Sequence, residues 1–133
     1  MTPPNEVSDR ELKSVIADFL DQGHVENIVA MFRREPKYYQ WTGELLSDQR
    51  FSVRLGVSVL FEELRTLQPD KIVLAIPSLV RLLDAEEPLL RGEAVSILGI
   101  IGTTEALAPL RRLHGDPSPQ VREMVALVLE EQI

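Results

Sequence analysis

The sequence has no cysteine, which excludes disulfides, thiolate nucleophiles and cysteine-ligated zinc. Aromatic residues make up only 5% of its 133 residues, and His24 and His114 are the only histidines. Neither histidine has a second one at metal-ligand spacing, and the seven glycines form no phosphate-binding loop. We therefore expect no metal, no cofactor and no catalytic activity.

Basic residues are outnumbered by acidic ones, which gives a formal net charge of −7. Binding to nucleic acid or to anionic membranes depends on clustered Lys and Arg, so neither is expected as a partner. No apolar run approaches the ~20 residues that span a bilayer. The polar start, Met1 to Glu6, is unlike a signal peptide. We expect a soluble, cytoplasmic protein with one domain.

Apolar residues recur throughout at spacings of three and four, which predicts helices. No segment of useful length alternates apolar and polar residues, as a half-buried strand would. Ser8 and Glu11 form a capping-box pattern at the first helix start. Residues 1–7 are expected to be a flexible tail. The expected helices cover about residues 8–22, 25–34, 37–46, 51–67, 69–83, 88–102, 104–114 and 118 to the C-terminus.

Three segments repeat one pattern, in which an apolar helical stretch ends in an aspartate and an arginine follows six, seven and six residues later. The pairs are Asp48 with Arg54, Asp84 with Arg91, and Asp116 with Arg122. Positions −1, +3, +6 and +7 from each arginine are apolar. The pattern predicts an all-α fold, a short right-handed α-solenoid of about four hairpins. It would form a single domain over residues 8–133, with a degenerate leading hairpin at 8–35 and repeats at about 37–67, 69–102 and 103–133.

The acid and base of each pair have a physical reason to recur. An aspartate in the turn between two helices accepts hydrogen bonds from free N–H groups at the next helix start. An arginine one turn into that helix can hold the carboxylate with a forked contact. We expect three such pairs, stacked as a structural ladder; the alternative is three unrelated surface charges.

The second and third repeats carry the most recognisable motifs. They are Leu82-Leu83-Asp84, Leu90-Arg91, Ala94 through Gly99, Ile101 and Gly102, then Leu113, Asp116-Pro117, Val121-Arg122 and Val125 through Leu129. From about Trp41 onward the chain resembles the HEAT-repeat superfamily, and within it the short bacterial HEAT-like repeats grouped with phycobilisome-lyase-type proteins. The resemblance implies an α-solenoid scaffold whose second helices line a concave face. The first clear repeat departs from the pattern at Leu55-Gly56 and Glu62-Glu63.

Two groups of residues are candidate partner contacts. Tyr38, Tyr39 and Trp41 either pack the leading hairpin against the first clear repeat or anchor a partner. Met124 and Leu127 belong to a last helix that is apolar on every side, although a solenoid end normally has a polar outer face. We hypothesise that this C-terminal hairpin docks on a second copy, giving a homo-oligomer, or on another protein. The alternative is that neighbouring helices cover it.

The leading functional hypothesis is a non-catalytic protein–protein interaction scaffold that presents a curved helical surface to a partner with a basic patch. Relatives within the resemblance attach or isomerise bilins, and other helical-repeat proteins act on alkylated DNA bases, but neither activity has a motif that transfers to this sequence. A bilin-lyase-like or other small-molecule-handling accessory is the alternative. A nucleic-acid binder is less favoured, because its basic clusters, Arg33, Arg34 and Lys37 with Arg111 and Arg112, look like solvated helix ends.

Overall fold

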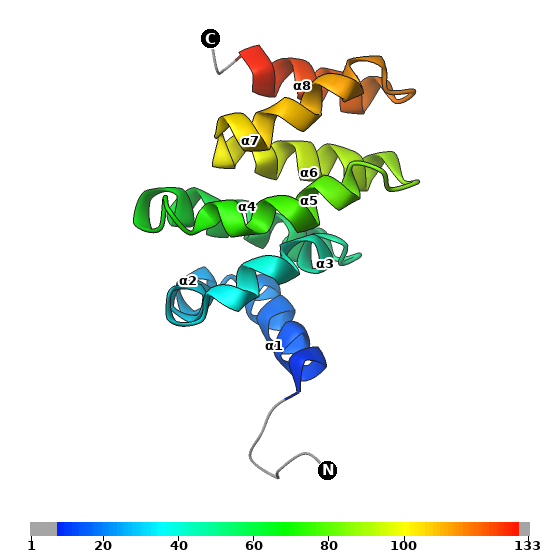
Figure 1. The fold of residues 1–133 in the computed structure, drawn as a ribbon. Coiled ribbons are helices and arrows are strands. Elements are labelled where there is room, and N and C mark those ends of the chain that lie inside the picture. The colour runs from blue at the N-terminus through cyan, green and yellow to red at the C-terminus, as the bar shows by residue number, and fades with distance from the viewer. Residues whose placement is uncertain (1–7, 131–133) are drawn as a thin grey trace.

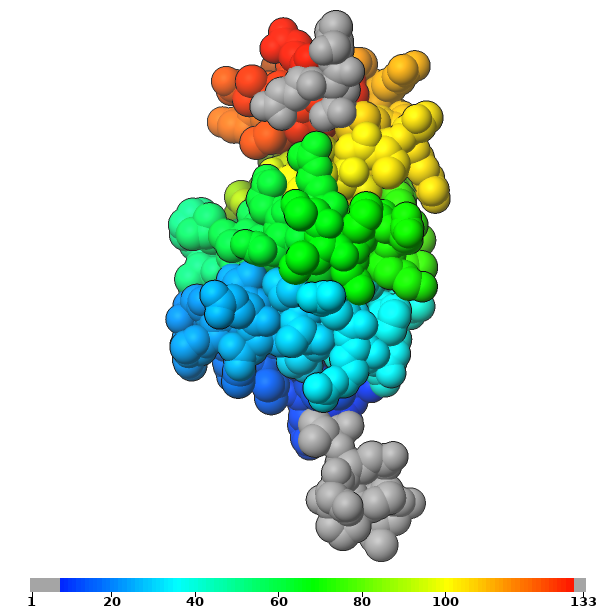
Figure 2. Space-filling view, turned by 90° about the vertical axis from the view of Figure 1, so that its left-hand side faces the viewer, coloured from blue at the N-terminus to red at the C-terminus, as the bar shows by residue number. Residues whose placement is uncertain are grey.

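The computed structural model describes residues 8–130 and contains only helices over that range. Helical pairs follow one another along the long axis of the molecule, from α1 at one end to α8 at the other (Figure 1). The side view in Figure 2 shows the same order from blue to red. The prediction of an all-α solenoid is confirmed. The predictions for residues 1–7 and for the last three residues lie outside the described part.

Two layers run through the stack. The first helices of the hairpins form one layer, and α4, α6 and α8 form the other, with α6 packed between α4 and α8 (Figure 1). The full-length helices are α1 (Asp9–Asp21), α2 (Val25–Arg34), α4 (Phe51–Leu67), α6 (Pro88–Ile101) and α8 (Pro119–Glu130). These bounds agree with the expected ranges, and Ser8 caps α1 by accepting from the Glu11 N–H at 3.2 Å.

The first helices of the three clear repeats are less regular than the sequence predicts. Each was expected to be one helix, and each instead joins a 3-10 segment to an α segment. They are η1 (Pro36–Trp41) with α3 (Thr42–Leu46), η2 (Ile72–Ala75) with α5 (Ile76–Leu82), and α7 (Thr104–Leu107) with η3 (Ala108–Gly115).

Prolines explain two of these breaks. Pro77 and Pro109 each stand in the first turn of the later segment. Proline has no N–H, and its ring clashes with the carbonyl four residues earlier, so an α-helix cannot run through that position undisturbed. In the last repeat, Thr103 caps α7 by accepting a hydrogen bond from the Ala106 N–H at 3.2 Å.

The core follows the predicted stripe on the second helices. Nearly all of the predicted positions are buried, and Leu90 and Leu129 are half-buried. Gly56 also has a packing role, because a Cβ there would lie 2.9 Å from the Leu20 Cβ and 3.1 Å from the Leu20 carbonyl oxygen. The glycine that departs from the repeat pattern therefore lets α1 approach α4 closely.

The aromatic cluster joins the leading hairpin to the first clear repeat. The fully buried Tyr39 ring lies 5.0 Å from Phe32 and 6.3 Å from Phe61, centroid to centroid. Its hydroxyl donates to Gln68 Oε1 at 2.9 Å, and burial raises the pKa of Tyr39 to about 12. Trp41 is also buried, so the packing interpretation holds for both residues and the partner-anchor interpretation is wrong for them. Half-buried Tyr38 packs on Trp41, with ring centroids 4.9 Å apart.

None of the described helices combines the length and the apolar character that a membrane crossing requires.

Candidate functional site

Two of the three repeat aspartates bind the start of the next helix, as expected. Asp48 Oδ1 accepts from the Arg50 N–H, and Asp116 Oδ1 accepts from the Ser118 N–H, both at 2.9 Å. Asp84 does neither. Its side chain is 71% exposed and meets Arg112 Nη1 at 3.2 Å across the surface.

The repeat arginines bind backbone oxygens, so the expected pairing with the carboxylate of the same turn is wrong. In each case Nη1 donates to the carbonyl oxygen six residues earlier: Arg54 to Asp48 (2.8 Å), Arg91 to Ala85 (2.8 Å) and Arg122 to Asp116 (2.6 Å). The equivalent position in the three turns is therefore the sixth residue before the arginine. In the second repeat this position is held by Ala85, not by Asp84. The spacing of seven in the second repeat was the signal of this difference.

A forked ion pair does form, but between neighbouring hairpins. Arg91 on α6 donates from Nε and Nη2 to the two carboxylate oxygens of Asp116, both at 2.9 Å. The Asp116 side chain is only 3% exposed, and the Arg91 hydrogen bonds hold the pKa of Asp116 below its usual range. The same contact raises the pKa of Arg91. This pair fixes α6 against the turn that precedes α8.

The equivalent junction between α4 and α6 is incomplete. The turn position that holds Asp116 in the last repeat holds Ala85 here, so Arg54 meets no carboxylate from that turn. The nearest acid is Glu93 of α6, whose Oε1 lies 3.8 Å from Arg54 Nε. Arg54 is 9% exposed, and its Nε has no hydrogen-bond partner in the described part of the chain. Burial raises the pKa of Glu93, because it penalises the charged carboxylate more than the nearby Arg54 favours it.

The solvent-facing side of α4 carries an apolar ridge. Phe51, Leu55 and Val59, spaced four residues apart, are 65%, 51% and 43% exposed. Relative to the repeat arginine, their positions in α6 are held by Pro88, Gly92 and Ser96. All three of those residues line a groove, so the ridge and the groove occur at the same helical phase.

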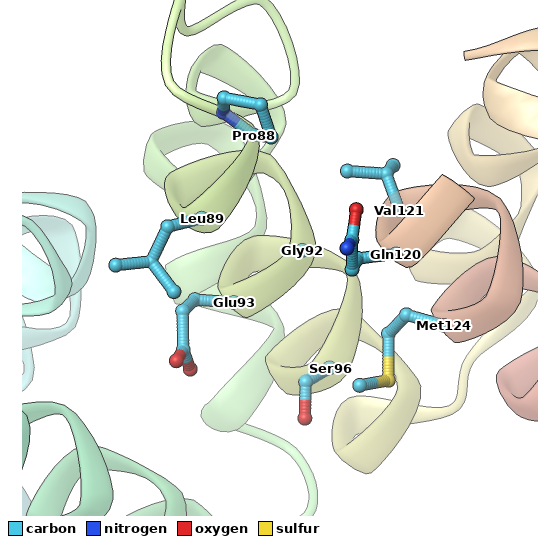
Figure 3. A pocket seen from close by; sticks show the side chains of 8 residues that line it. All are labelled: Pro88, Leu89, Gly92, Glu93, Ser96, Gln120, Val121 and Met124. Carbon is cyan, nitrogen blue, oxygen red and sulfur yellow. The ribbon is translucent and has the colours of Figure 1, made fainter. Parts of the chain in front are cut away.

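The groove, which we call the Gly92 groove, lies between α6 and α8 and has a volume of about 370 Å³. Figure 3 shows Leu89 and Glu93 on one side, Gln120, Val121 and Met124 on the other, and Gly92 on the helix between them. A Cβ at Gly92 would have no atom within 4 Å. Because glycine leaves this space open, the groove extends down to the α6 backbone.

The structure separates the residues predicted to contact a partner. Met124 lines the Gly92 groove, and Leu127, 48% exposed, lines an adjacent hollow on the same layer. The tyrosines and Trp41 lie instead on η1, in the first clear repeat. The apolar character of α8 has a further cause: Val121, Val125 and Val128 are buried. The covered-helix alternative therefore explains most of α8, and Leu127 alone among its large apolar side chains is exposed.

Sequence reasoning missed the apolar ridge, Leu89, Gly92 and Glu93. The sequence did contain a signal for the ridge: apolar residues outside the core stripe of the repeat, at positions −3, +1 and +5 from Arg54. At those positions the last repeat has Pro119, Glu123 and Leu127. Within residues 8–130, no three His, Asp or Glu side chains are grouped as metal ligands.

Comparison with known proteins adds one finding. A family model described as HEAT repeats matches residues 39–130. No curated protein and no solved structure gives a significant match. The matched range includes all three repeat arginines and both walls of the Gly92 groove.

Proposed function

The chain belongs to the HEAT-repeat family, and we propose that it is a non-catalytic scaffold that binds another protein through the face of α4, α6 and α8. The apolar ridge carries this proposal. Three large apolar side chains are exposed along one face of a helix that lies next to an apolar groove. Contiguous exposed apolar surface on a folded protein is typical of an interaction site.

The rigidity of the turns supports the same function. Each repeat arginine fixes its turn through backbone oxygens, and Arg91 and Asp116 join two hairpins. A face held in place before binding loses little conformational entropy when a partner docks. The net charge of −7 favours a partner with a basic surface.

One observation supports a second candidate, a carrier or accessory that handles a small molecule. The volume of the Gly92 groove lies within the range of small-ligand pockets, roughly 300–1,000 Å³. Among residues 8–130, however, Glu93 is the only titratable residue that lines it, and no histidine or aromatic side chain does so. These linings favour contact with a side chain of a partner over chemistry on a bound molecule.

Co-purification from the native host tests the proposed function. Tagged wild-type protein should retain a partner that Leu55→Glu loses, because the substitution places a charge in the middle of the apolar ridge. Leu74→Glu is the matched control, since Leu74 is similarly exposed, at 41%, but lies on η2 in the other layer.

The partner identified in this way is then purified for direct titration. We expect its affinity to fall at least about tenfold with Leu55→Glu, as for a residue in the energetic centre of an interface. Equal affinity for the wild type, Leu55→Glu and Leu74→Glu would exclude the α4 face as the binding surface. Light scattering of Leu127→Glu tests the self-association hypothesis separately: an unchanged monomeric mass for wild type and variant would remove it.

A further inference from the structure

We propose that the Gly92 groove binds a partner segment in which a large apolar side chain stands next to a lysine or arginine. The apolar side chain enters the groove over Gly92, and the cation pairs with Glu93. This inference rests on the proposed function and specifies the chemistry of the partner.

The lining of the groove determines the apolar half of the proposal. Leu89 lies on one side of Gly92, and Val121 and Met124 lie on the other (Figure 3). Because Gly92 has no side chain, an incoming group reaches the helix backbone and contacts both walls. The volume, about 370 Å³, is near the lower limit for ligand pockets and suits one or two side chains better than a whole helix.

The state of Glu93 determines the cationic half. Its carboxylate is partly removed from water, yet no hydrogen bond to it occurs within residues 8–130. Arg54 is the only cation within 4 Å in that range, and its Nη1 already donates to two carbonyl oxygens, those of Asp48 and Gln49. A partly desolvated carboxylate with one long ion pair and no hydrogen bond is incompletely compensated, so an ammonium or guanidinium brought by a ligand gains a favourable contact.

The surroundings favour a cationic segment over an anionic one. The hollow that adjoins the groove along Ser96 and Met124 contains Glu62 and a single cation, Arg65. The turn that leads into α6 contributes the exposed Glu86 and Glu87. The carboxylates of Glu93, Glu62 and the preceding turn outnumber the cations Arg54 and Arg65, and this balance favours a basic partner segment and speeds its association.

The groove needs no rearrangement to accept this segment. Its walls belong to α6 and α8, and the ion pair between Arg91, the residue before Gly92, and Asp116 holds α6 against the turn that precedes α8. This site differs from the open apolar ridge on α4 because it combines a preformed apolar cavity with Glu93, an acid that has only a long ion pair, at 3.8 Å, and no hydrogen bond within residues 8–130.

The test uses a random 12-residue peptide library displayed on phage, selected on the full-length protein. Enriched sequences are then synthesised with a fluorescent label and titrated by anisotropy. We expect enriched peptides to share a large apolar residue adjacent to Lys or Arg. Gly92→Leu should weaken their binding at least about tenfold, because the new side chain fills the groove.

Glu93→Gln tests the cation contact separately. Wild-type protein should prefer a Lys peptide over its Gln analogue by about tenfold, and Glu93→Gln should remove that preference. Glu105→Gln is the control, because Glu105 is an exposed acid on α7 in the other layer. Thermal unfolding checks that all variants fold; Gly92→Leu has open space around it, and Glu93→Gln removes a partly desolvated charge.

The outcomes separate the two proposals. Peptides without a cation, no enriched peptide at all, or binding unchanged by Gly92→Leu would each overturn the inference about the groove. Binding that Leu55→Glu weakens and Gly92→Leu does not would overturn it while leaving the proposed scaffold function intact. The scaffold function itself fails only in the co-purification experiment.

Discussion

The two junctions between the second helices differ, although each begins with the same arginine in the same register. Between α6 and α8, Arg91 forms a forked ion pair with Asp116. Between α4 and α6, Arg54 finds Ala85 at the corresponding turn position, and its Nε faces Glu93 at 3.8 Å without a hydrogen bond. A single residue in the following turn decides whether the arginine is satisfied within the scaffold.

This difference separates stability from function along the stack. Where the turn provides the acid, as at Asp116, the carboxylate is buried and both of its oxygens accept hydrogen bonds from the scaffold's own Arg91. Where the turn lacks it, the nearest acid comes from the helix and stays on the wall of a groove. Groups that are incompletely paired in the folded state are typical of sites that serve a ligand at some cost in stability.

Removing the complete ion pair should have the largest effect. Asp116→Ala leaves Arg91 and the Ser118 N–H without their partner, and we expect the free energy of unfolding to fall by about 3 kcal/mol. Urea denaturation measures the change. The matched change at the other junction, Glu93→Ala, should cost far less, because Glu93 makes no hydrogen bond in the described chain. Equal losses would contradict the proposed difference between the junctions.

Low pH should remove the stability that the ion pair between Asp116 and Arg91 contributes. The pKa of Asp116 is lowered in the folded state, so its stabilising contribution is present above the unfolded value of about 4 and is lost as the pH falls through the folded value. The stability difference between wild type and Asp116→Asn should therefore be largest near neutral pH and shrink below about pH 4. Urea titrations across this range measure it. A difference that stays constant with pH would show that the ion pair does not contribute.

Two glycines sharpen the comparison between closed and open helix faces. Gly56→Ala places a Cβ against the Leu20 carbonyl, so we expect a loss of about 2 kcal/mol in unfolding free energy. Gly92→Ala meets no atom, and replacing a helical glycine should instead stabilise by about 0.5 kcal/mol. Thermal unfolding of both variants provides the measurement. Destabilisation by Gly92→Ala would mean that the groove is closed in solution.

The smallest effect should come from adding the missing carboxylate to the junction between α4 and α6. Ala85→Asp provides the turn carboxylate that Arg54 lacks, and we expect a gain below about 1 kcal/mol. Ala85→Asn is the control without charge. Because Arg54 would then pair with the turn, Glu93 should become freer to bind a cation. A variant less stable than Ala85→Asn would show that the two turns are not equivalent.

The arrangement of the helices could be predicted from the sequence because it depends on local rules. The apolar spacing, the Ser8 cap and the end of α6 at Gly102 each depend on residues close together in the sequence, and the structure agrees with all three. The partners of the arginines could not be predicted in the same way. A guanidinium reaches several acceptors at once, and only the course of each turn determines whether a carbonyl or a carboxylate is the closer one.

The apolar ridge and the groove needed three-dimensional information for a related reason. Leu55 and Val57 are both aliphatic residues of α4, yet one is half exposed and the other fully buried. Hydropathy alone does not distinguish them, since exposure depends on which neighbours cover each side of the helix. The same holds for Tyr39, an expected partner contact that is fully buried against Phe32 of α2 and Phe61 of α4.

The sequence by itself determined the class of the fold, the repeat and the residues of its inner stripe, because helical periodicity and repeated spacing are properties of neighbouring residues. Only the tertiary structure decided that Asp116 joins two hairpins, that Asp84 stands apart, and that Gly92 opens a groove beside Glu93. Those features depend on distances between residues far apart in the chain, and such distances exist only once the hairpins have stacked.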